Sequence, residues 1–141
     1  MLESMIKAPR PSRGEASDVL NAVADGTDSV MLSNESANGD YPINAVSIIA
    51  KVCVEGEKTI NCKRILGDVK LYTPPPLESA ESIAATVAQC VSETKEITLI
   101  IALTDTGKLA RLLAKYRPEV NILACSVNAH TLRQLNLVRG V

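Results

Sequence analysis

Residues Met1–Pro42 read MLESMIKAPRPSRGEASDVLNAVADGTDSVMLSNESANGDYP, and the order of elements that they encode decides the fold. A proline-bounded segment precedes a helix pattern, a short apolar segment follows the helix, and a loop of Ser, Asn, Glu and Gly comes last. A parallel α/β barrel uses this order to place polar side chains at the carboxyl ends of its strands. We therefore predict the closing part of a barrel, with the chain beginning within the fold.

Local signals give the bounds of these first elements. Ser12 and Glu15 have the spacing of a capping box, which predicts a helix over Arg13–Ala24. The apolar run Ser29–Ser33 is expected to be a short buried parallel strand whose last residue faces the top of the barrel. A proline at the first helical position then predicts a second helix that starts at Pro42 and ends between about Cys53 and Glu57.

A domain boundary is predicted at Lys58–Pro76, where the helical spacing fades and three consecutive prolines form a stiff, extended connector. Beyond it, helix and strand patterns alternate as they do in βαβ units. The expected elements are helix Leu77–Thr94, strand Ile97–Leu103, helix Gly107–Tyr116, strand Asn121–Ser126 and helix Ala129–Val138. Such crossovers make the two strands parallel neighbours or near neighbours, with helices on both faces of the sheet.

Composition argues against several classes of partner. The 141 residues include 15 Lys and Arg against 16 Asp and Glu, so no basic field favours nucleic acid or an anionic membrane surface. No apolar run approaches the roughly 20 residues that cross a bilayer, which predicts a soluble protein. The cysteines lack C-x-x-C spacing and are interpreted as reduced thiols without a metal or redox role, as in the cytoplasm: Cys53, Cys62, Cys90 and Cys125.

Two parts of the chain resemble the pyruvate kinase family. The first is nearly continuous and consists of MLESM at Met1–Met5, PRPSRGE at Pro9–Glu15, DVLNAVADGTDSVMLS at Asp18–Ser33 and E-x-A-x-GDYP at Glu35–Pro42. The second resembles the first half of the family's C-terminal domain and consists of KYRPEVNIL at Lys115–Leu123 together with Leu137, Arg139 and Gly140.

This resemblance implies an α/β chain in three parts. Residues 1–57 would be the last helix-strand-helix portion of a TIM-type barrel, 58–76 a linker, and 77–141 the first half of a three-layer α/β C-terminal domain. The implied activity is phosphoryl transfer from phosphoenolpyruvate to ADP, giving pyruvate and ATP in glycolysis, with Mg²⁺ and K⁺ as cofactors. The family further implies a cytoplasmic, allosteric homotetramer. The 141 residues are expected to be inactive alone, because the main catalytic residues and metal ligands belong to earlier barrel strands.

The resemblance also implies a site after the predicted barrel strand. Ser33 matches a serine at the rim of the active site, which hydrogen-bonds its surroundings or relays a proton; a hydroxyl that only caps the turn is the alternative. The nucleotide-side loop comprises Asn34, Glu35, Ser36 and Asn38. The family usually has LSGETAKGDYP where this chain has LSNESANGDYP. Asn34 can take the left-handed backbone angles of the replaced glycine, and Asn38 removes a positive charge near the nucleotide phosphates.

A second candidate site is the loop TDTGKL, which follows a strand and opens a helix. A helix start of this kind offers free N–H groups and the positive end of the helix dipole to an anion. In the family's eukaryotic members, a T-x-[ST]-G-[RK]-[ST] loop here binds sugar bisphosphate activators, and this chain matches at Thr104, Thr106, Gly107 and Lys108. Asp105 adds a negative charge and Leu109 lacks the final hydroxyl, so a plain capped turn is the alternative.

Other polar residues have less specific roles. Arg13 matches a family arginine at the contact between neighbouring barrels of the tetramer, and a solvated helix-start arginine is the alternative. Glu3 is expected to lie at a helix start. Asn136 occupies a position where some relatives have a histidine that holds an amino-acid activator. The single histidine, His130, is interpreted as a surface or capping residue.

Two further functional hypotheses remain open. Asn34, Asn38 and Leu109 motivate a pyruvate-kinase-like component with reduced catalysis that serves as a structural or interaction part of a larger assembly. The loop Thr104–Lys108 motivates a segment that acts mainly as a regulatory, effector-binding half.

Overall fold

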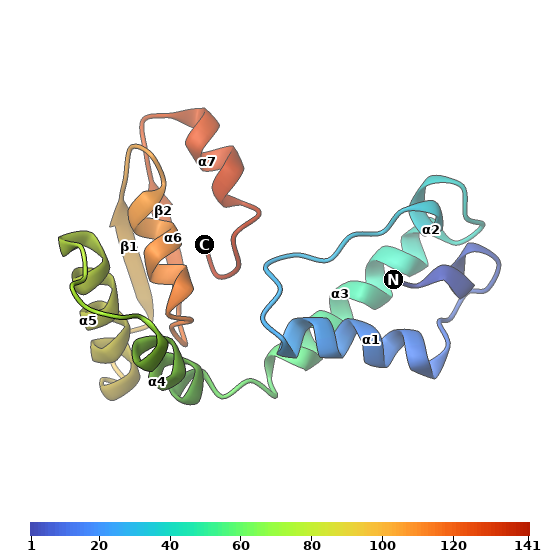
Figure 1. Ribbon diagram of the computed structural model, residues 1–141. Coiled ribbons are helices and arrows are strands. Elements are labelled where there is room, and N and C mark those ends of the chain that lie inside the picture. Colours follow the sequence, from blue (N-terminus) through green and yellow to red (C-terminus); the bar gives the residue numbers. More distant parts are fainter. The chain divides into compact units, whose positions relative to one another are not determined.

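The computed structural model describes residues 1–141. They form two compact units, Met1–Ile60 and Asn61–Val141, which are coloured along the sequence in Figure 1. Each unit has its own buried apolar cluster, so each is described by itself.

The first unit is a pair of helices with two short helical turns. It contains the 3-10 helix η1 at Glu3–Ile6 and the α-helices α1 at Arg13–Ala24, α2 at Asn34–Ala37 and α3 at Pro42–Glu57. Helices α1 and α3 lie side by side, and η1 lies beside α2. The core is small and aliphatic and is formed by Leu2, Met5, Val19, Ala45 and Ile49.

The predicted capping box of α1 is confirmed. The Ser12 hydroxyl accepts a hydrogen bond from the Glu15 N–H at 3.3 Å, and the Glu15 carboxylate accepts one from the Ser12 N–H at 2.8 Å. This reciprocal pair satisfies two backbone donors that a helix start would leave unpaired. Helix α1 therefore begins at the residue that the sequence pattern indicates.

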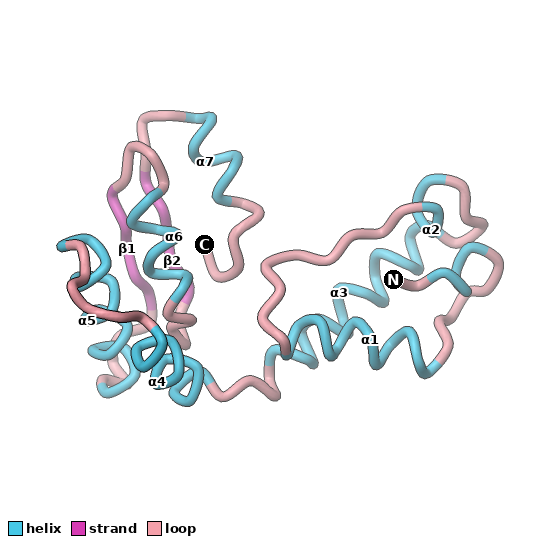
Figure 2. The backbone as a smooth tube through the Cα atoms, viewed as in Figure 1, coloured by secondary structure: helices cyan, strands magenta, loops and turns pink.

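The prediction of a strand at Ser29–Ser33 is wrong for this structure. Residues 27–32 are a loop in Figure 2, and the Met31 side chain is 76% exposed. A strand is defined by hydrogen bonds to a neighbouring strand, and Met1–Ile60 contains no second strand. Val30 and Leu32 still pack against the first unit's core, which explains the apolar character of the segment.

The second unit has a parallel strand pair with helices. Its elements are α4 at Cys62–Tyr72, α5 at Ser79–Glu93, β1 at Leu99–Leu103, α6 at Lys108–Lys115, β2 at Asn121–Cys125 and α7 at Ala129–Leu135. The predicted elements after the prolines are thus all present, with ends that differ by up to three residues. No helix was predicted between Lys58 and Pro76, but Cys62–Tyr72 is helical and begins at the side-chain cap of Asn61.

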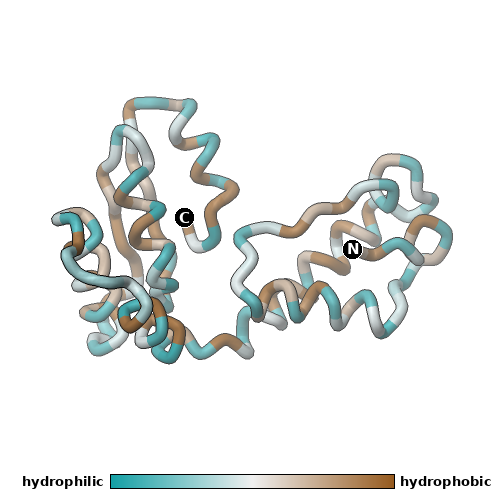
Figure 3. Tube along the Cα trace, viewed as in Figure 1, coloured by the Kyte–Doolittle hydropathy of each residue, from teal (hydrophilic) through white to brown (hydrophobic).

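Strands β1 and β2 are parallel neighbours, as predicted, and Ile101 lies opposite Leu123 in their register. Helix α6 packs on the sheet and α5 packs on α6, so Ile100, Ala102 and Ile122 are buried. The other face is apolar but open: Leu99, Ile101, Leu103 and Leu123 are between 45% and 76% exposed. The hydrophobic colour of both strands in Figure 3 reflects these two faces. Helices therefore cover one face of the sheet in these residues, and the prediction of cover on both faces is not met.

Candidate functional site

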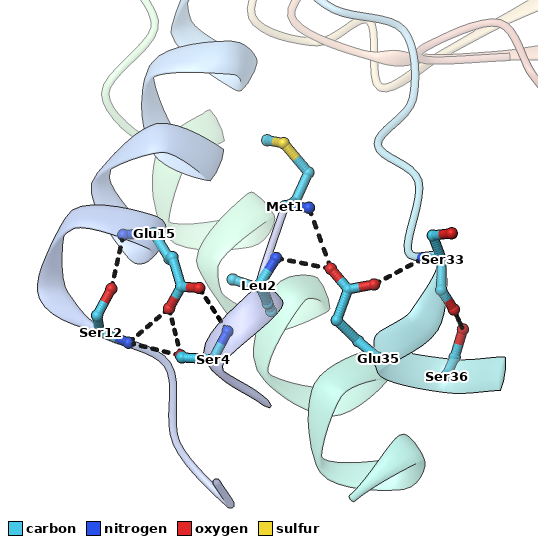
Figure 4. A network of polar contacts seen from close by, with 8 residues as sticks. All are labelled: Met1, Leu2, Ser4, Ser12, Glu15, Ser33, Glu35 and Ser36. Carbon is cyan, nitrogen blue, oxygen red and sulfur yellow. Dashed lines mark hydrogen bonds and ion pairs between the residues drawn. The ribbon is translucent and has the colours of Figure 1, made fainter. Parts of the chain in front are cut away.

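The loop after the predicted barrel strand holds Ser33 in a defined geometry. Ser33 precedes helix α2, and its backbone carbonyl accepts hydrogen bonds from the N–H groups of Ser36 at 3.2 Å and Ala37 at 3.0 Å. The Ser33 hydroxyl makes no capping hydrogen bond and points away from the Glu35 carboxylate in Figure 4. The backbone of Ser33 is thus occupied by the turn while its Oγ is left for another partner, contrary to the alternative of a capping hydroxyl.

Glu35 is buried, with 3% of its surface exposed. Its Oε1 accepts hydrogen bonds from the Leu2 N–H at 2.9 Å and from the Met1 nitrogen at 3.1 Å. Its Oε2 accepts a hydrogen bond from the Ser33 N–H at 2.7 Å. Hydrogen bonds from the backbone N–H groups of Glu35 itself and of Ser33 are the main cause that lowers the pKa of Glu35 to about 2. The carboxylate is therefore ionised and holds backbone, rather than pointing to solvent.

A second contact joins the same two segments. The Asp40 N–H donates to the Ile6 carbonyl at 2.9 Å, and the Lys7 ammonium lies 3.4 Å from the Asp40 carboxylate. A Cβ atom at Gly39 would come within 2.5 Å of the Glu35 carbonyl oxygen and 3.3 Å of the Ile6 Cα. A side chain at this position would collide with the carbonyl of its own turn and crowd η1, so Gly39 is needed for the arrangement.

The other predicted residues of this loop lie on its surface. Asn34, Ser36 and Asn38 are all exposed. Asn34 is the first residue of α2, with right-handed backbone angles, so the expected need for left-handed angles at this position does not arise. The Ser36 hydroxyl donates to the Ser33 carbonyl at 3.3 Å, which reinforces the turn.

A second, half-buried carboxylate was only partly predicted from the sequence. Glu15, expected as a capping-box residue, also accepts hydrogen bonds from the N–H of Ser4 at 2.7 Å and from the Ser4 hydroxyl. Partial burial opposes ionisation of Glu15, but the hydrogen bonds from Ser4 and Ser12 outweigh it and lower its pKa to about 2. Figure 4 shows Glu15 and Glu35 on either side of the Leu2 segment. The contact to Ser4 joins residues 11 apart in the chain and has no local sequence signal.

In the second unit, the loop Thr104–Lys108 is a capped turn. The Thr104 hydroxyl accepts from the Gly107 N–H at 3.0 Å, and the Thr106 hydroxyl accepts from the Lys108 N–H at 3.4 Å. Gly107 has φ of +79°, which glycine adopts without strain. The Asp105 carbonyl accepts from the Thr131 hydroxyl at 2.8 Å, which ties the loop to α7. The loop has the predicted shape, and its own hydroxyls occupy two of the N–H groups that an anion would use.

The cation of this loop also has a partner. The Lys108 ammonium pairs with the Glu78 carboxylate, and the Arg111 guanidinium donates to the Thr106 carbonyl at 3.2 Å. A cavity of about 520 Å³ in this unit is lined by Lys63, Lys95 and Asn121 among others, and no residue of Thr104–Lys108 lines it. An anion at the loop would therefore have to displace Glu78 from Lys108.

The remaining candidates lie at the surface. Arg13 is the exposed first residue of α1. His130 is exposed, and its backbone N–H donates a hydrogen bond to the Asn128 side-chain oxygen at 3.0 Å. This agrees with a surface position near a helix start. Glu3 lies in the first turn of η1, as expected, and Asn136 is the exposed residue that ends α7.

Neither the cysteines nor the other possible metal ligands form a site in this structure. All four cysteines are free thiols, and burial raises the pKa of the Cys62 thiol. Three or more His, Cys, Asp or Glu residues do not come together anywhere in the chain in a way that could hold a metal ion. None of the helices is both long and apolar enough to span a membrane.

Comparison with known proteins gives matches in both units. Residues 1–46 match the family model of the pyruvate kinase barrel domain, and residues 81–141 match that of the pyruvate kinase alpha/beta domain. The chain is 47% identical to pyruvate kinase of Eimeria tenella over 141 residues, which is all of this chain and 26% of that protein. It is 50% identical over 127 residues to the cytosolic isozyme of Glycine max, covering 90% of this chain and 25% of that protein.

Solved structures agree with the sequence matches. A crystal structure of pyruvate kinase from Cryptosporidium parvum superposes on 99% of this chain with a TM-score of 0.97 at 42% identity, and the match covers 28% of that protein. A structure of the C. parvum enzyme in complex with ADP superposes with a TM-score of 0.92. The chain thus spans about a quarter of the length of its relatives, with a partial α/β fold made of barrel and alpha/beta-domain pieces. With matches to both of the family's domain models and to its solved structures, the chain belongs to the pyruvate kinase family.

Proposed function

We propose that these residues act as a segment of a longer pyruvate kinase, which transfers the phosphoryl group of phosphoenolpyruvate to ADP and yields pyruvate and ATP. The observation that carries the proposal is the Ser33 loop, where a free hydroxyl projects from a backbone held by Glu35 within the part that matches the barrel domain. Relatives about four times longer support the view that the remaining groups come from outside these residues. The isolated chain is expected to be inactive.

In this proposal Ser33 is a member of the active-site rim. Its hydroxyl would hydrogen-bond the reacting groups or relay a proton, since a hydroxyl is both donor and acceptor. The exposed Asn34, Ser36 and Asn38 would form the nucleotide side of the rim. The C. parvum pyruvate kinase that binds ADP supports ADP as the nucleotide. Because Asn38 carries no charge, it would contact a phosphate as a neutral hydrogen-bond donor only.

The cofactors Mg²⁺ and K⁺ belong to the longer protein in this proposal. Phosphoryl transfer depends on neutralising the charge of the phosphate oxygens, and metal ions supply this. Residues 1–141 do not bring together a group of carboxylates, histidines or cysteines that could hold a metal ion. The ligands are therefore assigned to barrel strands outside this chain.

We also propose binding roles for Arg13 and for the loop Thr104–Lys108. The exposed Arg13 would contact a carboxylate of a neighbouring barrel in a homotetramer, where its guanidinium can bind in a bidentate manner. The loop Thr104–Lys108 would bind a phosphate of a sugar bisphosphate effector once Lys108 leaves Glu78.

The domain division is likewise a proposal, based on the resemblance to the pyruvate kinase family: barrel residues 1–57, a linking segment 58–76 and C-terminal domain residues 77–141. Cysteines in the free state are consistent with a cytoplasmic location.

The test is an assay of the full-length protein that carries these residues. Pyruvate formation from phosphoenolpyruvate and ADP is measured with Mg²⁺ and K⁺ present, and the isolated chain serves as a blank. We expect robust turnover from the full-length protein and none from the blank. A folded full-length protein without turnover would contradict the proposal and favour the structural or interaction role suggested by Asn34 and Asn38.

The role of Ser33 is tested in the same assay. Ser33→Ala is expected to lower kcat about 10-fold to 100-fold, because a positioned proton-transfer group contributes on the order of 100-fold or more. Ser47→Ala, a matched change of an exposed serine on α3, is expected to leave kcat within about twofold. Equal kcat values for the two variants would remove Ser33 from the rim.

A further inference from the structure

We propose that Glu35 is a positioning residue, which holds the Ser33 loop against the Met1–Ile6 segment so that the Ser33 Cα–Cβ bond has one direction and its hydroxyl one location; this inference rests on the proposed function. The position Glu35 was expected on the nucleotide side of the loop. Its carboxylate instead faces inward and is 3% exposed, so it is not available to a nucleotide.

The two carboxylate oxygens of Glu35 bind different segments of the chain. Oε2 accepts from the N–H of Ser33 at 2.7 Å, and Oε1 accepts from the N–H of Leu2 at 2.9 Å. One carboxylate therefore joins segments that are more than 30 residues apart in the chain. Hydrogen bonds to an ionised acceptor are short and strong. The carboxylate therefore restrains the distance between the backbones of Leu2 and Ser33, the residue whose hydroxyl is proposed to act.

A further contact to the Met1–Ile6 segment follows the C-terminal end of helix α2. Asp40 donates from its N–H to the Ile6 carbonyl at 2.9 Å, and Gly39 allows an approach that a Cβ atom would prevent. The loop is thus attached to the Met1–Ile6 segment at both ends, through Glu35 before the helical turn and through Gly39 and Asp40 after it. A turn held at both ends has little freedom to shift, so the position of the Ser33 backbone and the direction of its Cα–Cβ bond are set by these contacts.

Glu15 supplies a matched control within the same unit. It is also an ionised carboxylate that accepts two backbone N–H groups, from Ser4 at 2.7 Å and Ser12 at 2.8 Å. It also holds the Met1–Ile6 segment, but it joins that segment to α1 and makes no contact with Ser33. A purely structural role for both glutamates would make Glu35→Gln and Glu15→Gln equivalent in their effect on activity.

The experiment measures kcat, KM and thermal stability of the full-length protein and four variants, with activity expressed per folded molecule. Glu35→Gln replaces one acceptor oxygen by an NH₂ group, which cannot accept a hydrogen bond from the backbone N–H that faces it. We expect kcat to fall about 10-fold to 100-fold, since small misplacements of a reacting group cost up to roughly 100-fold, while KM changes less than about twofold. Glu15→Gln is expected to lower Tm to a similar extent and to leave kcat within about twofold.

A double-mutant comparison separates positioning from other causes. If Glu35 acts through Ser33, the variant that combines Ser33→Ala with Glu35→Gln has the kcat of Ser33→Ala alone, because effects of residues that act as one unit are not additive. Multiplicative losses in the double variant would overturn the proposal. An equal loss of kcat in Glu35→Gln and Glu15→Gln would also overturn it.

A second substitution addresses a Glu35→Gln protein that does not fold. Gly39→Ala keeps the carboxylate and shifts the loop by the clash with the Glu35 carbonyl, and it is expected to lower kcat at least about fivefold with little change in KM. Unchanged kcat in a folded Gly39→Ala protein would contradict the inference. Absence of turnover in the unsubstituted full-length protein would instead contradict the proposed function, so the two failures are distinguishable.

Discussion

At the scale of single residues, two carboxylates with depressed pKa values link the stability of the first unit to pH. The pKa values of Glu15 and Glu35 fall from 4.5 to about 2, so both groups bind protons less readily in the folded state than in the unfolded state. Their stabilising effect is complete above about pH 4.5 and is lost as pH falls toward 2. Acid should therefore loosen the attachment of the Met1–Ile6 segment first.

This linkage can be measured with Glu35→Gln in the full-length protein. Above about pH 5 the substitution is expected to cost roughly 2 kcal/mol, the usual value for a hydrogen bond to a charged group. The difference in Tm between the unsubstituted protein and the variant should shrink between pH 4.5 and 2, because the carboxylate becomes protonated. A difference in Tm that does not change over this range would show that the ionised carboxylate is not responsible.

A pair of glycines in the second unit provides a second residue-scale prediction. Gly107 has φ of +79°, and a Cβ there would lie 3.2 Å from both the Arg111 guanidinium and the Leu135 side chain. Gly67 lies within α4, and a Cβ there would meet no atom within 4 Å. Gly107→Ala should destabilise by about 1–2 kcal/mol through the left-handed angles, whereas Gly67→Ala should stabilise by about 0.5–1 kcal/mol. Denaturant unfolding of the full-length protein measures both, and changes of the same sign would refute the explanation.

At the scale of elements, helix α1 depends on its capping box. The hydroxyl of Ser12 and the carboxylate of Glu15 satisfy donors at the helix start. Ser12→Ala should cost about 1 kcal/mol and should increase hydrogen exchange in the first turn of α1. Ser17→Ala in the same helix removes only a hydroxyl bonded to the Arg13 carbonyl and should change stability by less than about 0.5 kcal/mol. Equal exchange rates in the two variants would argue against the cap.

At the scale of the whole molecule, the open sheet face decides how the isolated chain behaves. Ile101 and Leu103 are 64% and 76% exposed on the face that no helix covers. Exposed apolar surface of this kind favours association, so we expect the isolated 141 residues to aggregate or to remain largely unfolded. Light scattering after size-exclusion chromatography tests this, and a monomer that melts cooperatively would contradict it.

A substitution pair links this behaviour to the sheet face itself. Replacing Ile101 and Leu103 by Thr places β-branched side chains, which strands favour, at both positions and reduces the apolar area. The soluble fraction of the isolated chain should rise. Replacing two exposed polar residues of α5, Ser82 and Thr86, by Ala should leave the soluble fraction unchanged. Equal solubility of the two variants would place the cause outside the sheet face.

Much of the element order could be predicted from local patterns. Capping signals, proline and glycine positions and apolar spacing depend on residues a few positions apart, so helix α1 began at the predicted residue and the strands of the second unit were placed to within two residues. One local prediction was wrong, and one helix was missed. Ser29–Ser33 had an apolar strand pattern but lacks a partner strand in this unit, and helix α4 at Cys62–Tyr72, which packs on α5, was not predicted.

By itself, the sequence determined the family, the order of the elements and the residue types at the candidate site, because motifs and short-range spacing are properties of the chain. Only the tertiary structure decided what those residues do. The inward turn of the Glu35 carboxylate depends on the N–H group of Leu2, which lies more than 30 residues away in the chain. The pairing of Lys108 with Glu78 depends on where two helices meet. Burial and hydrogen bonding between distant segments arise only when the chain has folded, so no local pattern could reveal them.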